Sequence, residues 1–313
     1  MKMKPRINAG RHFTVLVIAL FCLATLAHAM PEWQIEQRAL NGTVFVETDI
    51  GDANGFFVAP HRIVVPYHAI AGTSFARGRN AADGHWFQVA GVTAVDADRN
   101  LAILSVSIRG NPLPLGNSDD IRSGKDIYVQ SYSRGEKSFT KGKVEDRKGR
   151  KFCEKVEFSI AVKVEPGSDG APILNVDGKV VGIFLRGLVK SEATFPLLDF
   201  AIRSNFLKSL RDRGWGSVVQ HFPLQGNLNL CALISRGNMK FEKGDYDAAY
   251  ADYSRVISRN RDAAIAYSNR GSVRLKWGHT AEAAADFRLA KGAAKRINWS
   301  KLGRVLGKII KIF

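Results

Sequence analysis

The last third of the chain repeats itself at intervals of 34 residues. The pairs that share this spacing are Leu233 and Tyr267, Arg236 and Arg270, Gly237 and Gly271, Gly244 and Gly278, Ala249 and Ala283, and Tyr253 and Phe287. Glycine and alanine let two helices approach closely, and the larger residues fill the space between them. A repeat of this length is typical of an α-helical solenoid, in which each helix pair covers the apolar face of the next. The sequence therefore predicts two helix pairs, at residues 230–263 and 264–297.

The repeat resembles the tetratricopeptide (TPR) family, which has units of the same length. It departs from the family pattern at Leu233, where the first unit would carry Tyr or Trp, and it lacks the proline that closes each unit. The resemblance implies a surface that binds proteins. Residues 297–313 carry an apolar stripe with basic residues mostly opposite, which predicts a helix that caps the end of the solenoid. The alternative for this segment is a helix that lies on a membrane surface.

Upstream of the repeats, from about Gly42 to Arg186, short alternating runs of apolar and polar residues are separated by Gly, Asn, Asp and Pro. The runs are Thr43–Thr48, Gly55–Val58, Arg62–Val65, Trp86–Val92, Leu101–Val106, Asp126–Gln130, Lys155–Val164 and Lys179–Leu185. Many short strands at this spacing predict a β-sandwich or a β-barrel. The period becomes helical after Ser204, and the segment 214–228, with its Gly, Pro and Asn, is expected to be a linker.

One turn between these runs has a composition suited to chemistry. Glu165–Asn175 reads E-P-G-S-D-G-A-P-I-L-N and follows a run that ends at Val164. Gly167 and Gly170 permit backbone angles that other residues avoid, so consecutive backbone N–H groups can converge on one point. Convergent amides of this kind stabilise the negatively charged oxygen that forms in acyl-transfer reactions.

Within this turn, Gly167–Pro172 resembles the serine motif of trypsin-like proteases, G-x-S-G-G-P or G-x-S-G-A-P. Arg62–Ile70 resembles that family's histidine motif, and Val95–Val106 resembles its aspartate motif. Three other stretches resemble the bacterial HtrA-type branch: Asn54–Val58, Leu113–Asp119 and Phe200–Asn205. The resemblance covers about residues 40–212 and implies a chymotrypsin-like double β-barrel. The HtrA-type branch carries PDZ domains after the protease, whereas here a TPR array would take their place.

Two of the three catalytic positions that the resemblance implies hold another residue type. His68 is the expected base, but Asn100 stands at the aspartate position and Asp169 at the nucleophile position. The oxyanion amides would be those of Gly167 and Asp169. Asparagine cannot supply the charge that stabilises the protonated imidazole, and the same change in a trypsin-like protease lowers the rate by about 10⁴. A carboxylate is a poor nucleophile toward amides, and its charge competes for the oxyanion amides.

These departures predict a catalytically inactive pseudoprotease that binds proteins through its barrel cleft and its TPR array. We also expect Asp169 to pair with His68 at hydrogen-bond distance and to block the oxyanion amides. The alternative is an active serine endopeptidase of periplasmic quality control that uses Ser168 as nucleophile, or Asp98 in place of Asn100. No cofactor and no metal are expected, because the sequence contains no metal-ligand cluster and no nucleotide-binding loop.

The first 29 residues predict a secretory signal that is removed from the mature protein. A basic leader precedes the apolar run Phe13–Leu26, and Ala27-His28-Ala29 fits a cleavage site before Met30. A membrane anchor is the alternative, although the apolar run is short for a bilayer span. The mature protein is therefore expected in the periplasm or outside the cell. Its expected parts are a trypsin-like domain at 30–213, a linker at 214–228, and the repeats with their cap at 229–313.

The formal net charge of the chain is +17, and much of it belongs to the C-terminal part. From Asn229 onward there are 17 Lys and Arg against 7 Asp and Glu. A basic surface attracts acidic protein segments or anionic lipid headgroups, so we expect acidic protein partners at the TPR region and no nucleic acid. An oxidising compartment would permit a disulfide between Cys153 and Cys231, and two separate buried thiols are the alternative.

Overall fold

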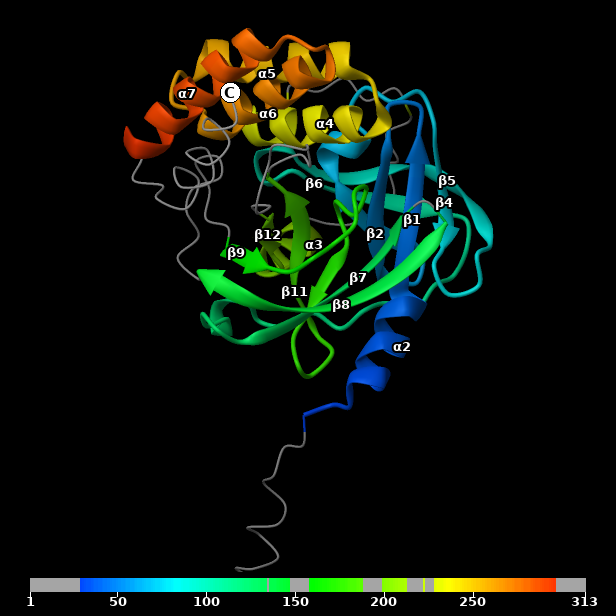
Figure 1. Ribbon diagram of the computed structural model, residues 1–313. Coiled ribbons are helices and arrows are strands. Elements are labelled where there is room, and N and C mark those ends of the chain that lie inside the picture. The colour runs from blue at the N-terminus through cyan, green and yellow to red at the C-terminus, as the bar shows by residue number, and fades with distance from the viewer. Residues whose placement is uncertain are drawn as a thin grey trace, which may run out of the picture.

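The computed structural model describes residues 29–133, 135–146, 158–187, 199–212, 222 and 228–296. Two closed β-barrels are followed by a stack of helices that lies across one side of them (Figure 1). The predicted fold, a double β-barrel with a helical solenoid, is confirmed. The expected leader, most of the expected linker and the capping helix at 297–313 lie outside the described residues, so the domain boundaries stay predictions.

The first barrel closes in the strand order β1–β2–β3–β6–β5–β4. Its strands are β1 (Thr43–Thr48), β2 (Asp52–Ala59), β3 (Arg62–Pro66), β4 (Ala76–Asn80), β5 (Trp86–Asp96) and β6 (Leu101–Val106). Two short 3₁₀ turns flank the central pair: η1 (Tyr67–Ala69) follows β3, and η2 (Ala97–Arg99) precedes β6. Because Pro66 of β3 pairs with Leu101 of β6, the two turns leave the barrel next to each other.

The second barrel closes in the order β10–β11–β12–β9–β8–β7. Its strands are β7 (Asp126–Ser133), β8 (Glu136–Asp146), β9 (Phe158–Ala161), β10 (Pro172–Leu174), β11 (Val180–Arg186) and β12 (Asp199–Arg203). Phe158, Ile173 and Phe184 are fully buried in its interior. The Gly-rich turn of the sequence connects β9 to β10 and faces the first barrel, since Asn54 N donates to Asp169 O at 2.6 Å.

Three shorter elements surround the barrels: α2 (Glu32–Gly42), η3 (Ser118–Asp120) and α3 (Asn205–Asp212). Ile35 and Ala39 of α2 are fully buried in an apolar cluster that also contains Phe56 of the first barrel and Ile183 of the second. Helix α2 therefore helps to hold the two barrels together. Because residues of both barrels belong to this apolar cluster, burying its side chains stabilises the packing of one barrel against the other.

The two repeats form four antiparallel helices: α4 (Leu230–Lys243), α5 (Tyr246–Arg259), α6 (Ala264–Lys276) and α7 (Thr280–Arg296). Gly237 of α4 lies against the ring of Tyr253 on α5, and a Cβ added to Gly237 would lie 2.6 Å from that ring. At the equivalent place in the second repeat, a Cβ on Gly271 would lie 2.9 Å from the ring of Phe287. The 34-residue spacing thus reflects the same close helix contact made twice.

The repeats also share an ion pair that the spacing alone did not reveal. Arg236 forms two hydrogen bonds with the carboxylate of Asp252, at 2.8 and 2.6 Å. In the second repeat Arg270 forms the same pair of bonds with Asp286, at 2.9 and 2.7 Å. Each ion pair joins the two helices of its own repeat. Both aspartates are buried, so water competes little for these charge-assisted hydrogen bonds.

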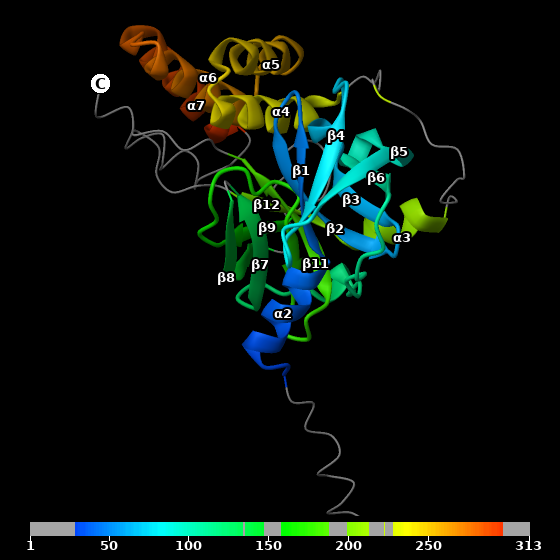
Figure 2. The same ribbon diagram turned by 90° about the vertical axis from the view of Figure 1, so that its right-hand side faces the viewer.

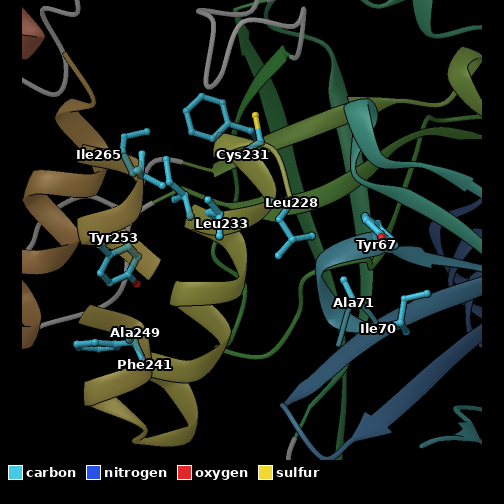
Figure 3. Close-up of a cluster of buried hydrophobic side chains, with 14 of the residues drawn as sticks. Tyr67, Ile70, Ala71, Leu228, Cys231, Leu233, Phe241, Ala249, Tyr253 and Ile265 are labelled. Atoms are coloured by element: carbon cyan, nitrogen blue, oxygen red, sulfur yellow. The ribbon is translucent and has the colours of Figure 1, made fainter. Parts of the chain in front are cut away.

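The repeats pack directly on the first barrel rather than standing apart from it. A single apolar cluster contains Tyr67, Ile70 and Ala71 beside η1 together with Leu228 and Leu233 at the start of α4 (Figure 3). In both ribbon views α4 runs along the barrels, with α5 on its far side (Figures 1 and 2). The shared apolar burial favours one fixed arrangement of barrels and repeats.

Cys231, in this shared cluster, is disulfide-bonded. The other two cysteines of the chain, Cys22 and Cys153, both lie outside the described residues, and so the partner of Cys231 does too. Among the described residues, no helix is both long enough and apolar enough to cross a membrane.

Candidate active site

His68 and Asn100 meet at the end of the first barrel because the turns that carry them are adjacent. Tyr67 N donates to Asn100 O at 3.0 Å, which joins η1 to η2. Asn100 has φ 57° and is the one non-glycine residue among those described that adopts the left-handed region. Asparagine tolerates this region better than most residues, so the residue type at position 100 suits the backbone conformation found there. Both side chains are buried, and that of His68 is fully enclosed.

The Asn100 side chain is oriented by the backbone of His68. His68 N donates to Asn100 Oδ1 at 2.9 Å, and a backbone amide can only donate. Asn100 Nδ2 then lies 2.8 Å from His68 Nδ1, closer than Oδ1, which lies 3.2 Å from the same nitrogen. We therefore assign Nδ1 as an acceptor and place the imidazole proton on Nε2.

Asp169 lies on the other side of the imidazole. Its Oδ2 is 3.5 Å from His68 Nε2, which is longer than a charge-assisted hydrogen bond, and Nε2 makes no hydrogen bond to any residue that the structure describes. Asp169 Oδ1 instead accepts from the backbone N–H of Arg186, at 2.7 Å. The expected pairing is thus a looser contact than a hydrogen bond, and the aspartate is anchored to the end of β11.

Ser168, the alternative nucleophile, is not directed toward His68. Its hydroxyl is buried and donates to Glu165 O at 2.7 Å, within the same turn. Gly170 brings the turn so close to β2 that an added Cβ would lie 2.0 Å from Asn54 O. Asp98, the alternative carboxylate, is exposed at η2, whereas His68 is fully enclosed.

Asn54 of β2 fastens the Gly-rich turn to both barrels. Its Nδ2 donates to Gly167 O at 2.9 Å and to Tyr132 O at 3.1 Å, and its Oδ1 accepts from Tyr132 N at 2.7 Å. The side chain is fully buried, and these three bonds to the backbone satisfy both polar atoms of its amide. Asn54 therefore fixes the position of the turn relative to His68.

The amide of Gly167 has a partner from the repeats. Gly167 N–H donates to Oε2 of Glu242, on α4, at 2.6 Å. Oε1 of Glu242 lies 3.3 Å from Nε of Arg186, whose side chain is almost completely buried. Arg186 Nη2 donates to Val164 O at 2.7 Å and to Glu165 O at 3.0 Å. Gly167 and Glu242 also line a pocket, together with Phe45, Asp52, Ser133, Pro166, Met239 and Lys243.

Burial raises the pKa of Glu242 to about 7. The Arg186 guanidinium and the hydrogen bond from Gly167 lower that pKa, whereas the nearby carboxylates of Asp169 and Asp199 raise it. Burial therefore outweighs the attraction of the arginine, and Glu242 changes its charge close to neutral pH. Within the described residues no cluster of His, Cys, Asp or Glu could hold a metal ion.

Comparisons with known proteins agree with this geometry. A family model described as a trypsin-like peptidase domain matches residues 53–183, and a TPR repeat model matches residues 237–278. The chain carries a trypsin-like peptidase domain, followed by a TPR repeat. The curated relatives of the trypsin-like domain include probable periplasmic serine endoproteases described as DegP-like.

Two curated relatives and one solved structure illustrate the similarity. The anti-sigma-I factor RsgI9 of Acetivibrio thermocellus is 26% identical over 174 residues, which cover 54% of this chain and 24% of that protein. A probable periplasmic serine endoprotease, DegP-like, of Chlamydia muridarum is 26% identical over 214 residues, or 64% of this chain and 40% of that protein. The chain thus spans less than half the length of either relative. The HtrA-type protease AlgW with tripeptide shares the fold, with a TM-score of 0.51, 18% identity, and coverage of 58% of this chain and 62% of that one.

The trypsin-like domain brings together three of the residues that the sequence singled out, namely His68, Asn100 and Asp169. Gly167 joins them through its turn, whereas the hydroxyl of Ser168 is directed elsewhere. The sequence did not indicate that Glu242 and Arg186 belong to the site. A buried arginine at the end of β11 carries no pattern, and Glu242 resembles any acidic residue on a helix surface. Asn54 was noted within a motif, but its bonds to the turn could not be foreseen.

Proposed function

We propose that this protein is an exported, catalytically inactive trypsin-like domain whose role is to bind proteins. The observation that carries the proposal is the pair of side chains on the two sides of His68. The Asn100 amide places the proton on Nε2, the nitrogen that would have to accept a proton from a nucleophile. On the Nε2 side stands a carboxylate, Asp169, rather than a hydroxyl.

The chemistry of these groups supports inactivity at each step of acyl transfer. A protonated Nε2 cannot act as general base, and Asp169 is tied to the Arg186 backbone by a 2.7 Å hydrogen bond. The Gly167 amide, which would stabilise a developing oxyanion, already donates to Glu242. No observation favours Ser168 as a replacement, because its hydroxyl donates within its own turn.

Binding is the function that the remaining surface supports. TPR repeats are protein-binding modules, and the positive charge of the segment from Asn229 onward favours acidic partners. Such binding should weaken strongly with salt, since exposed charges more than about 8 Å apart are screened at physiological ionic strength. A C-terminal helix on the membrane surface is the other contact that the basic charge would allow.

Export is supported by the leader pattern of the first 29 residues and by the DegP-like relative, which is described as periplasmic. A protein purified from the periplasmic fraction that begins at Met30 would agree with this part of the proposal. A protein that stays in the cytoplasm with its leader intact would contradict it.

The catalytic part is tested by incubating the mature protein with casein and, separately, with a fluorophosphonate probe. We expect no cleavage and no covalent label, with an active trypsin-like protease as positive control. The decisive comparison is Ser168→Ala, because a label that is present in the wild type and absent from this variant would establish an active serine and overturn the proposal.

A further inference from the structure

The first TPR helix makes polar contacts with the face of the barrels that carries His68 and Asp169. Glu242 accepts from the Gly167 amide at 2.6 Å and lies 3.3 Å from Nε of Arg186. One turn earlier on the same helix, Asn238 Nδ2 donates to Arg186 O at 2.7 Å. Arg186 is therefore held by α4 through its side chain and through its backbone.

The second repeat contributes to the same contact. Asn269 of α6 donates from Nδ2 to Gly187 O at 3.1 Å and to Asn238 Oδ1 at 2.7 Å. Tyr253 of α5 donates its hydroxyl to Asn238 Oδ1 at 2.9 Å. Both asparagines are buried, so three helices of the solenoid form one hydrogen-bonded network that ends on the carbonyls of Arg186 and Gly187.

Apolar burial completes the contact between helix and barrel. Met239, next to Asn238, packs in a small cluster with Ala53 of β2 and Ala69 of η1. Gly51 leaves space for this side chain, because an added Cβ there would lie 2.5 Å from it. Ala69 directly follows His68, so α4 contacts both the turn that carries the histidine and the turn that carries Asp169.

We propose that α4 is a built-in ligand of the trypsin-like cleft, held by Glu242 on the Gly167 amide, and that a protein partner gains access only when α4 moves away. The proposal rests on the proposed function in one respect, since it treats the cleft as a binding site rather than as a hydrolytic site. It also means that, in the closed state, the face of the repeats that carries Asn238 and Asn269 is covered by the barrels, and the cleft is covered by the repeats.

Glu242 makes the closed state depend on pH. The groups that face it are Arg186 of β11, Asp169 of the turn, Asp199 of β12 and Tyr253 of α5, with Asp52 and Lys243 at the adjoining pocket. Its pKa in the closed state is about 7, above the 4.5 of a free glutamate, so the closed state binds the proton more tightly than an open state. Closure is therefore most favourable below about pH 4.5 and is weakened as the pH rises through about 7. Over that range the closed-to-open ratio should fall on the order of a hundredfold.

The test is hydrogen exchange at the Gly167 amide in the full mature chain, measured at pH 5.5 and pH 8 and corrected for the intrinsic rate. We expect protection in the wild type that is stronger at pH 5.5. In Glu242→Ala exchange should be at least about tenfold faster at both pH values, because the acceptor is gone. In Glu242→Gln the amide oxygen remains an acceptor, so protection should persist without its pH dependence.

Asp247→Asn is the matched control, since it removes an exposed carboxylate from the next helix of the same repeat. It should behave as the wild type does. Should Glu242→Ala fail to fold, Glu242→Gln still decides the question through its loss of pH dependence. Unchanged exchange in Glu242→Ala, or retained pH dependence in Glu242→Gln, would overturn the inference while leaving the inactive enzyme untouched. A serine-dependent fluorophosphonate label would overturn the proposed function without altering these exchange rates.

Discussion

Asn100 Nδ2 lies 2.8 Å from Nδ1 of His68, and this contact decides which nitrogen of the imidazole carries the proton. The contact exists because the backbone N–H of His68 holds the amide oxygen of Asn100 at 2.9 Å. The histidine therefore presents an N–H, rather than a lone pair, to the place where a nucleophile would stand. In a trypsin-like domain this tautomer cannot act as a base.

Replacing Asn100 with Asp should reverse this tautomer. A carboxylate accepts from Nδ1, so the proton should move from Nε2 to Nδ1 in the neutral imidazole. Nitrogen-15 NMR of the ring nitrogens at neutral pH distinguishes the two forms. His85, which is exposed, serves as an internal reference and should not change. An unchanged His68 spectrum in Asn100→Asp would show that Asn100 does not select the tautomer.

Rebuilding the family's triad should not suffice for activity. Asn100→Asp with Asp169→Ser supplies the missing groups, but Glu242 still takes the Gly167 amide. Since the loss of one oxyanion donor costs about 10²–10³ in rate, adding Glu242→Ala should raise casein hydrolysis by about 10². Asp247→Asn in place of Glu242→Ala should not raise it. Full activity in the double variant would mean that Glu242 does not obstruct the site.

The buried ion pair of the second repeat should contribute strongly to stability. Asp286 is buried and bonds to Arg270 and Arg274, so Asp286→Asn leaves two half-buried cationic groups without their counter-charge. We expect a loss of about 3 kcal/mol in the free energy of unfolding, measured with urea. Asp262→Asn is the control, because its ion pair with Arg296 is about half exposed and should contribute less than about 1 kcal/mol. Equal losses in the two variants would contradict this assignment.

The close contact between the helices of the first repeat should not tolerate a side chain at Gly237. In Gly237→Ala the new methyl group would lie 2.6 Å from the ring of Tyr253, so the helices must separate, at a cost of about 1–3 kcal/mol. Gly292→Ala on α7 is the matched control, since among the described residues its Cβ meets nothing nearer than Arg296 Nη1 at 3.6 Å. That substitution should stabilise its helix by up to about 1 kcal/mol. A thermal melt that falls for both variants, or for neither, would contradict the packing argument.

Much of the architecture could be predicted because helices and strands leave local periods in the sequence. The run Thr43–Thr48 corresponds to β1, and Leu101–Val106 corresponds to β6, without any change of bounds. The strand β8, Glu136–Asp146, has no such pattern, because most of its residues on both faces are exposed or half-buried. It is recognised as a strand through its hydrogen bonds to β7 on one side and β9 on the other.

The sequence by itself determined the repeat. Through motifs that resemble those of trypsin-like proteases, it also predicted the two-barrel fold and the site positions His68, Asn100 and Asp169, since each motif consists of residues close together in the chain. Only the tertiary structure decided that Asp169 bonds to the Arg186 backbone and that Glu242 bonds to Gly167, 75 positions away. Glu242 stands between Phe241 and Lys243, where an acidic residue on a helix is ordinarily exposed to water. Its burial requires that the barrels and the repeats have already packed together, and no local period carries that information.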